Sequence, residues 1–235
     1  RQLQDIEISL HCWQTDDVVG FEPKAGALSG GIQATGNYPG KARNIDEVRA
    51  DLEKVMSLLP ARQRVNLHEI YGDFGSHFVD RDQCDASHFE SWMQWAAEQG
   101  INLDFNSSSF SHPKSGDLSL SHPDKAIRDF WIEHTKRCRH IASVMGERQG
   151  STCYMNLWVH DGSKDITVGL MKYRELFADS LDQIFAVKEP HMQTGLESKV
   201  FGIGLESYTV GSNEFYMGYA TKHQTYLTID TGHYH

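Results

Sequence analysis

The sequence lacks the features of membrane and secreted proteins. None of its apolar runs approaches the roughly 20 residues that a membrane span needs, and its N-terminal stretch has no secretory signal pattern. Its four cysteines, Cys12, Cys84, Cys138 and Cys153, form no C-x-x-C pair. A chain of 235 residues also needs no disulfide framework. We therefore expect reduced thiols and a cytoplasmic protein without a membrane partner.

Basic residues are scarce as well. The chain has 22 Lys and Arg residues against 32 Asp and Glu residues, a formal charge of −10. This balance argues against nucleic acid as a partner, because a phosphate backbone attracts a basic surface. The sequence also lacks a G-x-S-x-G elbow and any cysteine with the local signature of a nucleophile. Hydrolases of these two kinds are therefore not indicated.

Apolar residues, at 39% of the chain, are sufficient for a substantial core. No linker, low-complexity tract or repeat is visible, so we expect a single domain over residues 1–235. Short β-rich runs alternate with helical patterns. The β-rich runs cover 6–13, 65–71, 101–106, 153–159, 192–196 and 226–229, and the helical patterns cover 44–59, 87–99, 121–145, 166–187 and 212–221.

Local signals mark the ends of several predicted helices. Asn44 is a predicted N-cap, and Ser87 with Glu90 has the spacing of a capping box. Gly100 and Gly146 are predicted stops for the second and third helices.

This alternation of strand and helix predicts an α/β fold with parallel strands joined by right-handed crossovers. Six strands with five helices fit both a doubly wound sheet and most of a (β/α)8 barrel. Polar residues gather at the C-terminal ends of the strands, which form the catalytic face in both folds. The Gly-rich stretch 20–40 is predicted to be a loop over that face.

The sequence places a carboxylate at the end of one predicted strand, and a carboxylate and an imidazole at the end of the next. Glu197 follows one β-rich run, and Asp230 and His233 follow another. These ligand types suit a hard divalent cation such as Mn²⁺, Mg²⁺, Co²⁺ or Zn²⁺. Lys199 could polarise a substrate oxygen, so the group indicates metal-assisted chemistry on a polyol or carbonyl. The alternative is a set of strand-end polar residues bonded to loops.

Further candidates stand at or near strand ends. His68 is interpreted as a substrate contact or proton shuttle, or as a structural histidine. Trp158 could wall a sugar pocket, although core packing is the commoner role of such a residue. Asp104 fits a ligand contact and a strand-end turn equally well. His134 and Cys138 have helical i, i+4 spacing, but without two further ligands the structural interpretation is favoured.

Further motifs are distributed along essentially the whole chain. They are His11-Cys12-Trp13-Gln14-Thr15-Asp16-Asp17, Gly36-Asn37-Tyr38-Pro39-Gly40, Asn66-Leu67-His68, Leu103-Asp104-Phe105-Asn106, Phe110-Ser111-His112-Pro113, Asn156-Leu157-Trp158, Glu197-Ser198-Lys199, Glu206-Ser207-Tyr208-Thr209-Val210-Gly211-Ser212-Asn213-Glu214 and Asp230-Thr231-Gly232-His233. Together and in this order, these segments resemble those of bacterial L-rhamnose isomerases. The resemblance implies a (β/α)8 TIM barrel of the xylose-isomerase-like type, of which the chain holds about six of eight strand–helix units, and a homotetramer.

The resemblance also implies two divalent cations per complete active site, with Mn²⁺ expected and Zn²⁺ or Co²⁺ as alternatives. Glu197 and Asp230 match ligands of the cation that holds the substrate, and His233 matches a ligand of the second, catalytic cation. Lys199 matches a lysine that contacts the substrate and acts in catalysis. His68 and Trp158 match residues that line the family's sugar pocket.

The reaction implied is the reversible isomerisation of L-rhamnose to L-rhamnulose, by either a hydride shift or an enediol. The family's remaining ligands lie on later strands, so we expect a C-terminally truncated chain that exposes two sheet edges and an apolar barrel interior. The alternatives are a related sugar epimerase, a metal-dependent endonuclease, which the net acidity disfavours, and a non-catalytic fragment that binds sugar or metal.

Overall fold

Six parallel strands form the centre of the molecule. The computed structural model describes residues 5–14, 21, 39–40, 42–110, 112–165, 167–199 and 207–233. The strands follow one another across the sheet in the order β1-β2-β3-β4-β6-β8, and each pairs in parallel with the next. This is the order of consecutive strands in a (β/α)8 barrel, and all six predicted strands are confirmed. They are β1 (Glu7–His11), β2 (Arg62–His68), β3 (Asn102–Ser108), β4 (Cys153–Trp158), β6 (Met192–Glu197) and β8 (Tyr226–Thr228).

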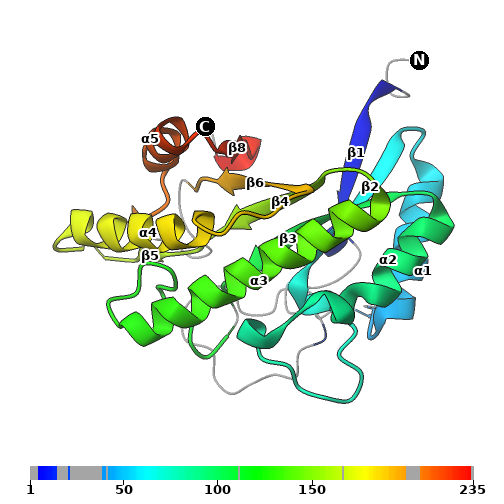
Figure 1. The fold of residues 1–235 in the computed structure, drawn as a ribbon, viewed down its shortest axis with the longest axis horizontal. Coiled ribbons are helices and arrows are strands. Elements are labelled where there is room, and N and C mark those ends of the chain that lie inside the picture. The colour runs from blue at the N-terminus through cyan, green and yellow to red at the C-terminus, as the bar shows by residue number, and fades with distance from the viewer. Residues whose placement is uncertain are drawn as a thin grey trace.

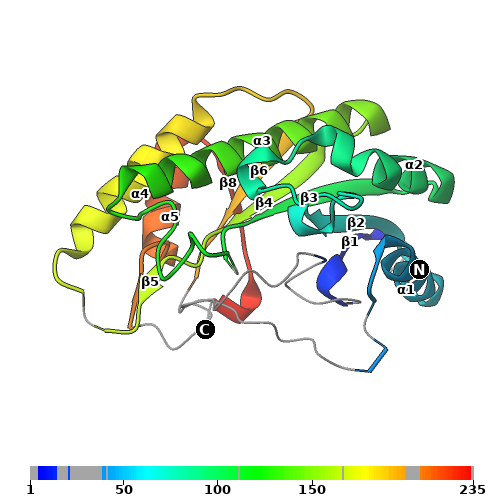
Figure 2. The same cartoon turned by 90° about the horizontal axis from the view of Figure 1, so that it is seen from below.

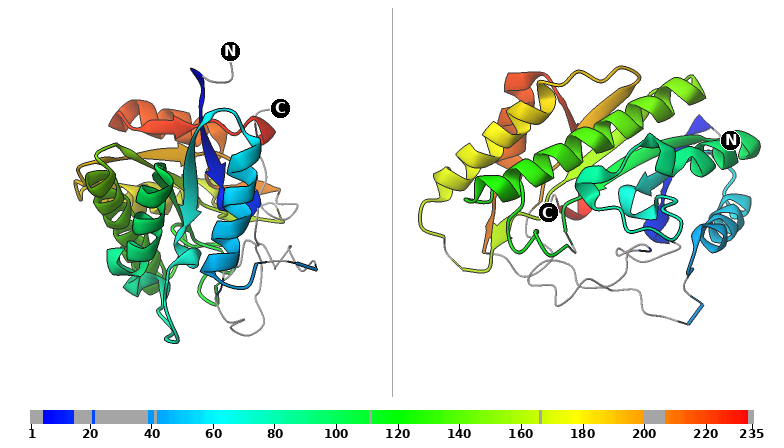
Figure 3. Two further views of the ribbon diagram at one scale, coloured as in Figure 1. Left: turned by 90° about the vertical axis from the view of Figure 1, so that its right-hand side faces the viewer. Right: turned by 60° about the horizontal axis from the view of Figure 1, so that its bottom comes forward.

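The helices connect the strands and cover one side of the sheet (Figure 1). Figure 2 shows α2, α3 and α4 on this side and the turn that follows β8 on the other. Helices α3 and α4 lie side by side, as the right-hand view of Figure 3 shows. The helices are α1 (Ile45–Leu58), α2 (Glu90–Gln99), α3 (Lys125–Gln149), α4 (Leu170–Phe185) and α5 (Asn213–His223).

Short elements complete the described part of the chain. Two strands that the sequence did not predict, β5 (Gly162–Ser163) and β7 (Tyr208–Thr209), form an antiparallel pair. The Gly-rich stretch 20–40 lies almost entirely outside the described residues, so its predicted loop stays a prediction. The 3-10 turns are η2 (Cys12–Gln14), η3 (Glu69–Tyr71), η4 (Arg81–Gln83), η5 (Ala86–Phe89) and η6 (Thr231–His233).

Two helix starts illustrate how local chemistry sets the boundaries. The Asn44 side chain accepts a hydrogen bond of 3.0 Å from the Glu47 amide, which confirms the predicted N-cap. The capping box predicted at Ser87 is wrong: it begins two residues earlier, at Asp85. The Asp85 carboxylate accepts from both the amide and the hydroxyl of Ser87, and this geometry opens the segment as the 3-10 turn η5 before α2 begins.

The predicted end of the third helix is also wrong, although its glycine has a clear role. Helix α3 continues through Gly146 to Gln149 and ends at Gly150, which adopts a φ of 63°. A β-carbon at position 146 would lie 1.9 Å from the carbonyl oxygen of His191. Gly146 therefore allows α3 to approach the segment before β6, and it does not terminate the helix. The predicted stop at Gly100, with φ of 67°, is confirmed.

The two faces of the sheet differ sharply in polarity. Residues at alternate positions of the strands point toward the helices and form the apolar core, which joins β1–β3 to α1 and α2, and β4 and β6 to α4 and α5. The intervening positions point to the opposite face, where most side chains are polar. The expectation of an apolar barrel interior is therefore only partly correct, because polar side chains share this face with Tyr154, Trp158 and Tyr226. The polar residues are Ser9, His11, Arg64, Asn66, His68, Asp104, Asn106, Asn156, Gln193, Glu197 and Thr228.

Within the described residues, no helix has the length and apolar character to cross a bilayer. All four cysteines are buried and free of disulfides, as predicted.

Candidate metal and sugar site

A cavity of about 990 Å³ occupies the polar face of the sheet. All six strands contribute to its walls. Five of the six site residues predicted from the sequence line it, and the sixth, Lys199, contacts one of the five. The five residues are His68, Trp158, Glu197, Asp230 and His233. The fold thus brings together side chains that lie far apart in the sequence.

Glu197, Asp230 and His233 form one group at the C-terminal end of the sheet. Their potential ligand atoms all lie within 4.8 Å of one another. The imidazole Nε2 of His233 is 3.3 Å from Asp230 Oδ2 and 3.9 Å from Glu197 Oε1. The Asp230 carboxylate accepts from the Gly232 amide at 2.7 Å, and the Asp230 backbone carbonyl accepts from the His233 amide at 2.9 Å. These two bonds fix the turn η6 that carries the imidazole.

The electrostatics of this group favour a bound cation. The pKa of Glu197 is raised to about 7, first by burial and then by the neighbouring Asp230 carboxylate. A hydrogen bond donated by the Asn156 side chain and the positive charge of Lys199 act in the opposite direction. Two carboxylates and an imidazole that converge in this way are the ligand set of a divalent cation. The residues present therefore fit the metal that the sequence predicted.

Lys199 and Trp158 form a cation–π pair beside this group. The Lys199 ammonium lies 3.9 Å from the centroid of the Trp158 ring, and its backbone amide donates to the Gly211 carbonyl at 3.0 Å. The Lys199 side chain is buried, and Trp158 lines the cavity. The ring thus serves both as a cavity wall and as a partner for the charge.

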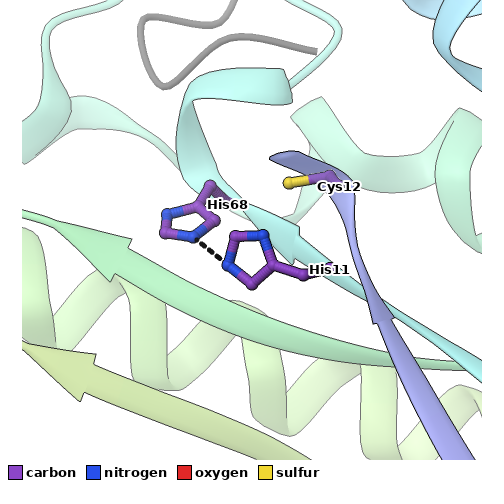
Figure 4. A group of neighbouring side chains, drawn as sticks. All are labelled: His11, Cys12 and His68. Carbon is purple, nitrogen blue, oxygen red and sulfur yellow. Dashed lines mark hydrogen bonds between the residues drawn. The ribbon is translucent and has the colours of Figure 1, made fainter. Parts of the chain in front are cut away.

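At the opposite side of the cavity, His68 contacts a residue whose importance was not evident from the sequence. His68 Nε2 lies 3.0 Å from Nε2 of His11, at the end of β1 (Figure 4). His68 Nδ1 is 2.6 Å from Ser108 Oγ, and its ring stacks on Trp13 with a centroid distance of 4.4 Å. Burial lowers the pKa of His11 to about 4 and that of His68 well below its usual value. His11 was recognisable only as part of a segment of the family resemblance.

Asp104 is neither a strand-end turn nor a free ligand. It lies within β3, and both its oxygens bond the guanidinium of Arg64, at 2.8 and 2.9 Å. Ser9 Oγ and the Tyr154 amide also donate to this carboxylate. Asp104 is therefore a buried structural anion that joins several strands at the wall of the cavity.

His134 and Cys138 also have a structural role. With Glu69 they form a buried group of potential ligand atoms. However, the guanidinium of Arg81 lies 3.7 Å from the Glu69 carboxylate and supplies the positive charge there. The Nδ1–H of His134 donates to the Arg81 carbonyl at 3.1 Å. These contacts agree with the structural interpretation of the helical His–Cys pair.

Comparison with known proteins identifies the group to which this chain is related. The sequence model of the family described as L-rhamnose isomerase (RhaA) matches residues 1–235. The L-rhamnose isomerase of Bacteroides thetaiotaomicron is 67% identical over 100% of this chain and 56% of that protein. The enzyme of Shigella flexneri serotype 5b is 53% identical over 100% of this chain and 57% of that protein.

Among solved structures, an L-ribulose 3-epimerase aligns over 93% of this chain and 57% of that chain, with 9% identity and a TM-score of 0.49. The chain spans about half the length of the curated relatives it matches. Because the family model covers all of its residues, the chain belongs to the L-rhamnose isomerase family.

Proposed function

We propose that the protein containing this chain is a metal-dependent aldose–ketose isomerase that interconverts L-rhamnose and L-rhamnulose. Family membership supports the reaction. The observation that carries the proposal is the convergence of Glu197, Asp230 and His233 at one end of a polar cavity. A site built from carboxylates, imidazoles and amides suits a neutral polyol, which offers many hydroxyl groups and no charge.

The reaction is redox-neutral and needs no external co-reactant. One hydrogen moves from C2 to C1, and one proton moves from the C2 oxygen to the C1 oxygen. Glu197, Asp230 and His233 would hold divalent cations, and the assignment of His233 to a second, catalytic cation stays a prediction. A bound divalent cation supplies Lewis-acid polarisation of the sugar oxygens. Lys199 would stabilise negative charge that develops on a substrate oxygen, and Trp158 and His68 would wall the sugar.

The decisive experiment measures ketose formation from L-rhamnose by the protein as the cell produces it, with Mn²⁺ and after chelation. We expect turnover with Mn²⁺ that disappears on chelation and returns when the cation is restored. Glu197→Gln should abolish turnover and weaken Mn²⁺ binding, whereas Glu98→Gln, on the exposed side of α2, should do neither. Unchanged turnover in Glu197→Gln would refute the assigned role. Mn²⁺ binding without ketose formation would support the alternative of a non-catalytic binding protein.

We further propose a homotetramer that acts in the cytoplasm and prefers Mn²⁺ over Zn²⁺ or Co²⁺. The buried, reduced cysteines are compatible with that compartment. Val168, just before α4, and Met171, in its first turn, are exposed apolar side chains that a subunit contact would cover. Sedimentation of the purified protein tests the assembly, and metal analysis of protein purified without added metal tests the preference.

A further inference from the structure

The hydrogen bonds around His11 and His68 have a fixed direction. The Trp13 backbone amide lies 3.1 Å from His11 Nδ1. A backbone N–H can only donate, so this ring nitrogen of His11 must accept. A neutral imidazole carries a single proton, and in His11 that proton must therefore lie on Nε2. The burial of His11 favours this neutral form.

The same reasoning extends to the second ring. The two Nε2 atoms are 3.0 Å apart, and because His11 Nε2–H donates, His68 Nε2 accepts. The proton of neutral His68 then lies on Nδ1, where it donates to Ser108 Oγ at 2.6 Å. One obligate donor, the Trp13 amide, thus sets the tautomers of both rings, which face each other in Figure 4.

We propose that His11 is a positioning residue that holds His68 in the Nδ1-protonated tautomer, so that the pair recognises a neutral hydroxyl group of the sugar. This role in sugar binding rests on the proposed function. The His11 Nε2–H is a donor and the His68 Nε2 is an acceptor, and both belong to residues that line the cavity. A sugar hydroxyl that displaces the His11–His68 hydrogen bond, with the two rings moving apart to admit its oxygen, would accept from His11 Nε2–H and donate to His68 Nε2. A carboxylate or phosphate oxygen could not donate, and an ammonium group could not accept.

The same pattern excludes the competing interpretation, a metal bound by His11, His68 and the adjacent Cys12. The ligand atoms of these three residues lie close enough for such a site. A metal on His11 Nε2 would require the ring proton on Nδ1. That proton would point at the Trp13 amide, donor against donor. The pair is therefore built for a hydroxyl group and not for a cation.

Two nearly isosteric substitutions separate the direction of the bond from the shape of the side chain. In His11→Gln, the carboxamide can turn its NH₂ group toward His68, as the Nδ1-protonated tautomer requires, so His68 Nε2 should remain unprotonated. In His11→Glu, the carboxylate can only accept, so His68 Nε2 should carry a proton in either the neutral ring or the imidazolium. Ser108→Ala removes the far acceptor but not the donor at position 11, and His68 Nε2 should again remain unprotonated.

The measurement is solid-state ¹⁵N NMR of the purified protein with labelled histidine, which distinguishes protonated from unprotonated ring nitrogens without substrate. Signals that disappear in His11→Gln and in His68→Gln assign the two rings. We also expect the KM for L-rhamnose to rise about tenfold more in His11→Glu than in His11→Gln, the factor that the loss of about 1.4 kcal/mol produces.

Wild-type His68 protonated on Nε2 would overturn the proposal, as would identical His68 tautomers in the Gln and Glu variants. If His11→Glu does not fold, the wild-type and His11→Gln spectra still decide the question. The two proposals fail separately. A protein that forms no ketose but shows the expected tautomers rejects the isomerase proposal and keeps the protonation pattern. A protein that forms ketose but shows the opposite tautomers keeps the isomerase proposal and rejects the protonation pattern.

Discussion

The buried ion pair of Asp104 and Arg64 should be among the most sensitive points of the fold. Both side chains are about 95% buried, and the two oxygens of Asp104 accept four hydrogen bonds. The donors are two guanidinium nitrogens, the Ser9 hydroxyl and the Tyr154 amide. One carboxylate therefore connects β1, β2, β3 and β4 at the wall of the cavity.

Asp104→Asn changes this centre at almost constant volume. One carboxylate oxygen becomes an NH₂ group, which faces donors that it cannot satisfy, and the guanidinium of Arg64 loses its adjacent counter-charge. Glu7, at 4.0 Å, is the remaining carboxylate that the structure places near Arg64. Removal of one partner from a buried ion pair costs about 3–5 kcal/mol. This is a large part of the roughly 5–15 kcal/mol by which proteins are stable.

Urea unfolding, followed by circular dichroism, measures this loss. Asp129→Asn is the matched control, because its ion pair with Lys125 is on the surface of α3 and should contribute less than about 1 kcal/mol. The double variant Arg64→Met/Asp104→Leu should be more stable than Asp104→Asn, since it leaves no buried charge. If Asp104→Asn is no more destabilising than Asp129→Asn, the assigned role of this ion pair is incorrect.

Two further predictions concern packing and acid stability. Gly146→Ala should lower the free energy of unfolding by about 1–3 kcal/mol, because its β-carbon would overlap the His191 carbonyl. The control is Gly218→Ala, at an exposed helical position with open space around it. This variant should leave the free energy of unfolding unchanged or raise it by up to about 1 kcal/mol. Burial lowers the pKa of His134 from 6.5 to about 3, so below pH 6.5 the unfolded chain binds a proton that the folded chain does not. The free energy of unfolding should therefore fall by about 2 kcal/mol between pH 7 and pH 5 through this residue. Urea titrations at both pH values measure this fall. It should be smaller than in the wild type for His134→Gln and unchanged for the control His140→Gln.

The sequence was informative about the strands because burial on the helix side imposes a strong apolar pattern. In β2, Val65 and Leu67 face the core and alternate with Arg64, Asn66 and His68 on the cavity side. The boundaries of all six strands were predicted to within a few residues. The helix ends were less predictable. Gly146 acts through a close contact with His191, which is distant in the sequence, and Asp85 forms an alternative cap that fits the same local pattern.

In the site, too, residues with a local sequence signal were predictable, and contacts that depend on the tertiary structure were not. Glu197, Asp230 and His233 were recognisable because each stands where an apolar run ends, and parallel strands place such positions at one edge. The His11–His68 pair was not recognisable from local pattern. In the sheet His11 is opposite Asn66, so the contact depends on a ring that reaches across the register to the last residue of β2. Single-strand patterns carry no information about such diagonal contacts.

Side-chain contacts link neighbouring strands along the whole polar face of the sheet. Near the N-terminal ends of the strands, Asp104 and Arg64 join β3 to β2. Near the C-terminal ends, His11 and His68 join β1 to β2, and the Asn156 side chain donates to Glu197 across β4 and β6. Site residues held by strands and by such contacts lose little freedom on binding. A substitution at Asp104 that lowers stability should therefore also disturb the alignment of His11 with His68. Its effect on sugar binding should exceed that of an equally destabilising substitution on the helix side.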